Sequence, residues 1–180
     1  GVMTRLIRDS GLTLGDPFDA ATRLGPLASA GQRDTVLGHI EQGKKEGAAL
    51  VAGGGRPSHL PKGFYVEPTI FANVDNRMTI AQEEIFGPVL SIGSFRDEDD
   101  AVFRGNETTY GLSAAVWTRD VSRAHKVARA LKSGRVWINT FGEADPTMAF
   151  GGYKQSGWGR EMGKEVLEHY TETKAVVMGL

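Results

Sequence analysis

Apolar side chains recur at helical spacing in the first third of the chain. Residues 29–46 place three of them on one face of a predicted helix, and Ser29 is available as its N-cap. That face consists of Val36, Leu37 and Ile40. Gly47 ends the helix. Residues 63–74, GFYVEPTIFANV, follow as two short predicted strands that Pro68 interrupts, as at a sheet edge or a bulge.

Between residues 89 and 140, short apolar runs alternate with polar segments of helical spacing. The runs VLSIGSF, GLSAAVWT and RVWINT are predicted strands, and the segments DEDDAVFRGNET and DVSRAHKVARALKSG are predicted helices that open with acidic residues. A β-α-β-α-β order with short connections predicts parallel strands joined by right-handed crossovers. The chain is therefore predicted to be an α/β protein.

The last quarter of the chain contains a glycine-rich candidate site loop and two further predicted elements. Ligands of open parallel sheets bind beyond the carboxyl ends of the strands, and WINTFGEADPTMAFGGYKQSGWGRE runs off the third strand at such an end. GREMGKEVLEHY is a predicted helix, and TKAVVMGL (173–180) is a predicted final strand that needs partners on both sides.

Composition excludes several classes of function. The 180 residues are 40% hydrophobic, enough for a real core. Because 21 basic residues face 22 acidic ones, we expect no binding to nucleic acid or to an anionic membrane. No apolar run approaches the roughly 20 residues of a membrane span. There is no cysteine, and we expect a soluble, cytoplasmic protein.

Motifs of known chemistry are scarce when the residues are considered alone. The four histidines lack metal-ligand spacing, so no metal site is predicted. GWGREMG does not follow the first strand of a β-α-β unit and is not a dinucleotide fingerprint.

Six segments resemble, in order, the NAD(P)-dependent aldehyde dehydrogenase superfamily. They are GDPFDAATRLGPLAS, GHIEQGKKEGAALVAGG, GFYVEPTIFANV, AQEEIFGPVLSI, YGLSAAVWTRD and FGGYKQSGWGRE. The resemblance covers essentially the whole chain. It implies a three-layer parallel sheet with helices on both faces, plus a terminal oligomerisation strand. Residues 1–160 would then belong to the C-terminal part of the catalytic domain, and residues 161–180 to a terminal helix and that strand.

The resemblance also implies a longer enzyme that oxidises an aldehyde to a carboxylic acid with NAD or, alternatively, NADP. Its catalytic cysteine and general-base glutamate would lie upstream of Gly1, so the 180 residues alone are expected to be inactive. Two alternatives stay open: a CoA-acylating or semialdehyde-type relative, and a non-catalytic structural fragment.

Four residues match cofactor-binding positions of the family. Glu84 corresponds to a carboxylate that accepts hydrogen bonds from the nicotinamide-ribose hydroxyls, a task suited to two charged oxygens facing a diol. Phe86 would pack beside the same ribose, Gln32 would contact the adenosine ribose, and Leu112 would lie near the nicotinamide. Alternatively, Glu83 and Glu84 cap a solvated helix end and Phe86 fills the core.

Other matches concern the substrate. Phe150 matches an aromatic residue of the aldehyde tunnel, against the alternative of a packing role. Gly142 and Ala144 are small residues in the same loop, which would widen the tunnel mouth for bulky aldehydes. Glu161 matches a carboxylate that relays protons during deacylation, although an acid at a helix N-terminus is the simpler interpretation.

The resemblance also implies that the protein assembles with further copies of itself. Arg160 and Glu172 match residues near a subunit interface, against the alternative of ordinary surface charges. Lys174 is the only charge in residues 174–180, so an unpaired terminal strand there would aggregate unless a second subunit covered it. We therefore expect a homodimer or homotetramer whose small-molecule partner is an aldehyde.

Overall fold

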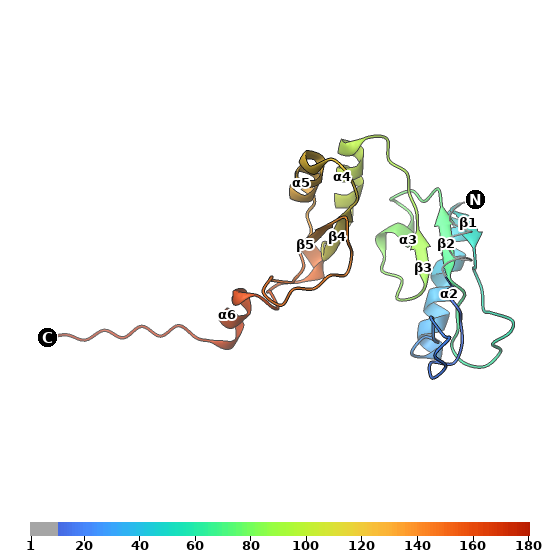
Figure 1. Ribbon diagram of the computed structural model, residues 1–180, viewed down its shortest axis with the longest axis horizontal. Helices are drawn as coiled ribbons and strands as arrows, with labels where there is room; N and C mark the ends of the chain where they lie inside the picture. The colour runs from blue at the N-terminus through green and yellow to red at the C-terminus, as the bar shows by residue number, and fades with distance from the viewer. Residues whose placement is uncertain (1–10) are drawn as a thin grey trace. The chain divides into compact units, whose positions relative to one another are not determined.

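The computed structural model describes residues 11–180, which form two compact units that divide between Ser94 and Phe95 (Figure 1). Each unit has its own sheet and its own helices. The expected division after residue 160 concerns roles within a longer enzyme and stays a prediction.

Helix α2 (Ala30–Lys45) is the main helix of the first unit, and it begins where the sequence predicts. The Ser29 hydroxyl accepts a hydrogen bond from the Gln32 N–H at 3.1 Å, which caps the first turn. Val36 and Ile40 are completely buried, so the predicted apolar face is confirmed.

The sheet of the first unit has the strand order β1-β2-β3, formed by Ala49–Ala52, Thr69–Ala72 and Val89–Ser91. Strand β1 is antiparallel to β2, whereas β2 is parallel to β3. Only the second half of the predicted strand pair at 63–74 forms a strand. The Glu67 N–H bonds Gly55 O at 2.9 Å, and Pro68 has no N–H with which to extend a ladder.

Phe71 of β2 is completely buried at the centre of the first unit's core. Helices α2 and α3 (Thr79–Gln82) pack against this core, and Gly43 allows a close approach, since a Cβ there would lie 2.8 Å from Ile80 Cδ1. The buried apolar cluster consists of Val36, Ile40, Ala48, Val66, Phe71, Val74 and Ile80.

The second unit follows the predicted alternation of strand and helix. Its elements are α4 (Glu98–Asn106), β4 (Ser113–Val116), α5 (Val121–Ala130) and β5 (Arg135–Ile138). Strands β4 and β5 are parallel, and α5 packs against both. Asp97 and Asp120 cap the two helices through their side chains. The predicted α/β class is confirmed.

The chain end differs from the prediction. Instead of one helix over 159–170, there are a 3-10 turn at Lys164–Val166 and the short α6 (Leu167–Tyr170). Gly159, Met162 and Gly163 have positive φ angles of 76°, 58° and 59°, which a right-handed helix excludes.

The predicted strand at 173–180 is not formed within the single chain. Residues 171–180 run on from α6 as an isolated trace (Figure 1), and Val177 is 94% exposed. A strand needs a hydrogen-bonded neighbour, and residues 173–180 have none within the described chain. The pairing of this segment with a second subunit stays a prediction.

Candidate functional site

Residues 83–88 connect α3 to β3 and are fixed to α2 by one long-range hydrogen bond. The Gln32 side-chain amide donates to the Phe86 carbonyl at 2.7 Å, although 54 positions separate the two residues. The Thr69 N–H bonds Pro88 O at 2.8 Å, which holds the far end of the segment on β2. The structure therefore brings together Gln32 and Phe86, and Glu84 lies in the same segment.

The two side chains of this segment that are assigned to cofactor binding are exposed to solvent. Glu84 is exposed, and the Phe86 ring is 70% exposed, so the interpretation of Phe86 as a core residue is wrong. Ile85, between them, packs on the core instead. An accessible carboxylate and an accessible aromatic ring on one short segment fit a ribose, which offers two hydroxyls and an apolar face.

A hollow of about 440 Å³ adjoins Phe86. Its walls are residues 24–27, Val66 and residues 86–88. Gly87 lies so close to α2 that an added Cβ would be 2.7 Å from a Val36 methyl, so the backbone of the segment is seated tightly on the helix. The segment therefore rests on a rigid support.

In the second unit, the candidate loop leaves β5 at Asn139, which adopts a left-handed conformation with φ of 56°. Asparagine tolerates this conformation better than most residues. Its side chain also pairs with the Thr118 backbone, accepting from the N–H at 2.8 Å and donating to the carbonyl at 2.9 Å. The loop thus begins from a fixed point beyond the carboxyl ends of both parallel strands, as expected.

The return of the loop brings four predicted residues around one hollow of about 390 Å³: Leu112, Phe150, Arg160 and Glu161. Phe150 and Glu161 form an isolated antiparallel bridge. Backbone also packs on backbone here, because a Cβ at Gly134 would overlap the carbonyl of Gly151.

Gly142 and Ala144 lie in the exposed part of the loop, where β5 side chains set its path. The Trp137 indole N–H donates to Glu143 O at 2.9 Å. Asp145 accepts hydrogen bonds from the Thr147 hydroxyl and N–H, and these bonds, with a smaller contribution from the charge of Arg135, hold the pKa of Asp145 below its ordinary value. The loop is therefore ordered by local contacts.

Comparison with known proteins decides the family. The sequence pattern of the aldehyde dehydrogenase family matches residues 5–176. The chain belongs to the aldehyde dehydrogenase family. Betaine aldehyde dehydrogenases from Rhizobium etli and Sinorhizobium fredii are 51% and 52% identical to it over 174 residues, which are 96% of this chain and 36% of each relative. The chain thus spans about a third of the length of these curated relatives.

Solved structures of aldehyde dehydrogenases match the fold closely. An aldehyde dehydrogenase from Mycobacterium tuberculosis, complexed with NAD⁺, aligns with a TM-score of 0.92 at 47% identity and covers 99% of this chain and 37% of its own. A mutant indole-3-acetaldehyde dehydrogenase from P. syringae, in complex with NAD⁺ and IAA, aligns with a TM-score of 0.93 at 46% identity, covering 99% of this chain and 36% of its own.

The two residues predicted at a subunit interface have different surroundings in this aldehyde dehydrogenase chain. The Arg160 guanidinium donates to Gly152 O and Gly159 O at 3.0 and 2.6 Å, and it lies 5.5 Å from the centre of the Tyr153 ring. Glu172 is exposed in the terminal segment, and the described residues contain no ion pair between it and Arg160. Their interface role stays a prediction.

Several residues that hold the loop were missed by sequence reasoning. His169 Nε2 accepts the Arg160 N–H at 3.1 Å, and the Ser156 hydroxyl oxygen accepts the Gly111 N–H at 3.0 Å. The Lys154 ammonium donates to two backbone carbonyls near the end of α4, at 2.8 and 2.9 Å. The density of glycine and polar residues in GGYKQSGWG was the available signal for a closely folded loop, but it does not indicate these partners.

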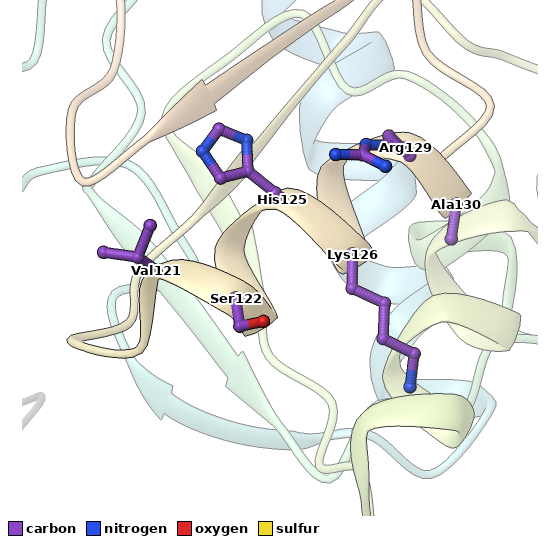
Figure 2. A pocket seen from close by; sticks show the side chains of 6 residues that line it. All are labelled: Val121, Ser122, His125, Lys126, Arg129 and Ala130. Carbon is purple, nitrogen blue, oxygen red and sulfur yellow. The ribbon is translucent and has the colours of Figure 1, made fainter.

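A further hollow of about 750 Å³ lies along α5, and every residue that lines it comes from that helix (Figure 2). Figure 2 shows His125 and Lys126 pointing in different directions. Lys126 is 2.6 Å from the Glu98 carboxylate of α4, which raises the pKa of Lys126. The side chains therefore do not converge on a ligand.

Within residues 11–180, no cluster of histidine, aspartate and glutamate residues could hold a metal ion. In the same residues, no helix is both long enough and apolar enough to cross a membrane.

Proposed function

We propose that this chain is the C-terminal portion of an NAD-dependent aldehyde dehydrogenase that converts an aldehyde to a carboxylic acid. The carrying observation is the segment 83–88, where an exposed carboxylate and an exposed ring are fixed to α2, in a chain that matches the family over almost its whole length. Because the chain contains no cysteine, the nucleophile of the reaction has to come from outside these 180 residues.

In this proposal, the first unit positions the nicotinamide cofactor, which accepts a hydride when it is bound. Glu84 accepts hydrogen bonds from both hydroxyls of the nicotinamide ribose, and the Phe86 ring packs against that ribose. Gln32 keeps the segment on α2 through its bond to Phe86 O, and it would contact the adenosine ribose from the same position.

The second unit contributes to the substrate side. Phe150 forms a wall of the aldehyde tunnel, and Leu112, which lines the same hollow, lies toward the nicotinamide of the cofactor. Gly142 and Ala144 leave the tunnel mouth wide, since neither side chain extends beyond one carbon. Glu161 is exposed beside Phe150 and is free to exchange protons with water during deacylation.

The exposed terminal segment supports a role in assembly. Residues 176–178 are apolar, with exposed fractions of 81% to 94%, so covering them with another chain removes apolar surface from water. We propose that residues 173–180 pair with the sheet of a second subunit in a homodimer or homotetramer.

A direct experiment uses the complete protein that contains this chain. It is incubated with NAD⁺ and a panel of aldehydes, including betaine aldehyde and indole-3-acetaldehyde, while NADH formation and the acid product are measured. Oxidation by the complete protein, without oxidation by residues 1–180 alone, is expected. Absence of NADH with every aldehyde would contradict the proposal, and an acyl-CoA product that depends on added CoA would favour the acylating class instead.

A further inference from the structure

Arg135 of β5 lies within cation–π distance of two aromatic rings of the second unit. Its guanidinium carbon lies 4.7 Å from the centre of the Phe150 ring and 5.8 Å from the centre of the Trp137 ring. The guanidinium also donates to Met148 O at 3.4 Å, two residues before Phe150. The side chain is half-buried, so the loop and the strand together hold the positive charge in place.

Aromatic ring faces attract cations, and cages of such rings are a common means of recognising quaternary ammonium groups. In this chain, Phe150 and Trp137 already share a cation that belongs to the protein. An arginine stays protonated at every ordinary pH and stacks well on rings because its guanidinium is planar. A positively charged ligand that approaches Phe150 therefore encounters a fixed positive charge where a cage would offer a free ring face.

The described residues contain no ion pair between Arg135 and the two carboxylates near Phe150, Asp145 and Glu161. Asp145 is the acidic group whose pKa responds to Arg135, but its carboxylate is bound by the Thr147 hydroxyl and N–H. Glu161, on the opposite strand of the bridge, has Arg160 beside it in the same hollow. Neither carboxylate therefore covers the guanidinium, which keeps its position on the Phe150 ring.

We propose that Arg135 is a specificity-determining residue that excludes aldehydes carrying a quaternary ammonium group from the tunnel. The inference rests on the proposed function, because it takes Phe150 as a wall of the aldehyde tunnel. Under this proposal, the substrate preference of this chain differs from that of the relatives of 51–52% identity that are named betaine aldehyde dehydrogenases.

The test compares two aldehydes of the same shape and different charge in the complete enzyme. Betaine aldehyde has a trimethylammonium group where 3,3-dimethylbutanal has a tert-butyl group. The ratio of kcat/KM for the two is measured in the parent and in Arg135→Met. We expect the parent to prefer 3,3-dimethylbutanal and the variant to shift the ratio about tenfold toward betaine aldehyde. Hydration of each aldehyde in water is the same for both proteins, so it cancels in the comparison.

Two further variants separate charge from packing. Arg135→Lys keeps the positive charge, so its ratio should stay within about threefold of the parent's, because Coulombic repulsion falls only slowly with distance. Arg129→Met makes the same substitution at an exposed position of α5 and should leave the ratio unchanged. Thermal unfolding and the KM for NAD⁺ are recorded for each variant. If Arg135→Met does not fold, Arg135→Ala serves in its place with the same expected shift.

The outcomes are distinct. A parent that prefers betaine aldehyde, or a folded neutral variant with the parental ratio, overturns the role of Arg135 while leaving aldehyde oxidation in place. A parent that oxidises no aldehyde overturns the proposed function and this inference together. A shift in the neutral variant that Arg135→Lys does not share supports exclusion by charge.

Discussion

Phe150 and Glu161 exchange both of their backbone hydrogen bonds: each N–H donates to the carbonyl of the other residue, at 2.7 Å in both cases. Two residues of the candidate site, eleven positions apart, are therefore joined without the use of either side chain. Substitutions at these positions test the chemistry of the side chains while the bridge stays in place.

Phe150→Ala in the complete enzyme should change the ranking of aldehydes by kcat/KM more than it changes the KM for NAD⁺. Since Phe150 is only half-buried, its removal should cost less than the roughly 3 to 5 kcal/mol of a fully buried phenylalanine. Phe103→Ala, on the exposed side of α4, is the matched control. A folded Phe150→Ala enzyme with the parental ranking would remove Phe150 from the tunnel.

Glu84→Gln keeps the size of the side chain and removes its charge. Because hydrogen bonds to a charged acceptor are stronger than those to a neutral one, hydride transfer in a single turnover should slow by about tenfold. Glu83→Gln, one residue earlier and also exposed, should have no comparable effect. Equal rates for the two variants would count against a ribose contact by Glu84.

Gln32→Leu removes the donor that holds the Phe86 carbonyl. The segment should then lose its hydrogen bond to α2 while keeping its packing there, so the KM for NAD⁺ should rise, and stability should fall by about 1 kcal/mol. Gln42→Leu on the same helix removes the bond to Glu46 and serves as the control, with a similar loss of stability and an unchanged KM. The two KM values, compared at equal temperature, decide between a cofactor role and a purely structural one.

Deletion of residues 173–180 from the complete protein should reduce its oligomeric state, because the apolar terminal segment would no longer pair with a second subunit. Sedimentation gives the mass directly. A truncated protein that keeps the parental mass and stability would show that assembly depends on other surfaces.

Asp100 should contribute to stability in a pH-dependent manner. Its carboxylate accepts the Arg96 N–H at 3.0 Å and also side-chain bonds from Arg96 and Arg104, which lower its pKa below the ordinary 3.8. A lowered pKa in the folded state means that the contribution is complete above the ordinary value and is lost as the pH falls through the folded value.

Asp100→Asn should therefore melt at a lower temperature than the parent at neutral pH, and the difference should shrink as the pH falls below about 3.8. Thermal unfolding across an acid series measures this, and Asp99→Asn, at the exposed neighbouring position, is the control. A constant difference at all pH values would exclude the ionised carboxylate as its source.

The alternating elements of residues 95–140 were predictable from the sequence because local signals agree there. Asp97 and Asp120 cap their helices as expected, and apolar runs between the helices become β4 and β5. Strand β1 was missed because its four residues, ALVA, stand among glycines and are defined only by pairing with β2. The helix expected at 159–170 failed because left-handed residues interrupt it, and such conformations leave no apolar periodicity.

The candidate site was likewise predictable from the sequence only in part. The resemblance supplied its residues, such as Glu84 and Phe150, but not the contacts that position them. The bonds from Gln32 to Phe86 O and from Lys154 to the carbonyl of Asn106 join positions 54 and 48 residues apart. A single hydrogen bond between distant segments forms only when the chain is folded, so no local sequence pattern predicts it.

The contact between Gly134 and Gly151 limits which positions of the loop can accept a new side chain. Because backbone meets backbone there, and the bridge from Phe150 to Glu161 is also made by the backbone, these two anchors of the loop do not depend on the side chains of Phe150 and Glu161. The exposed Ala144 can therefore change without disturbing either anchor, whereas any side chain at Gly142, whose φ is 82°, would strain the backbone. Variation in the loop is therefore confined to its exposed positions, because an added Cβ at Gly134 or Gly151 would overlap backbone atoms.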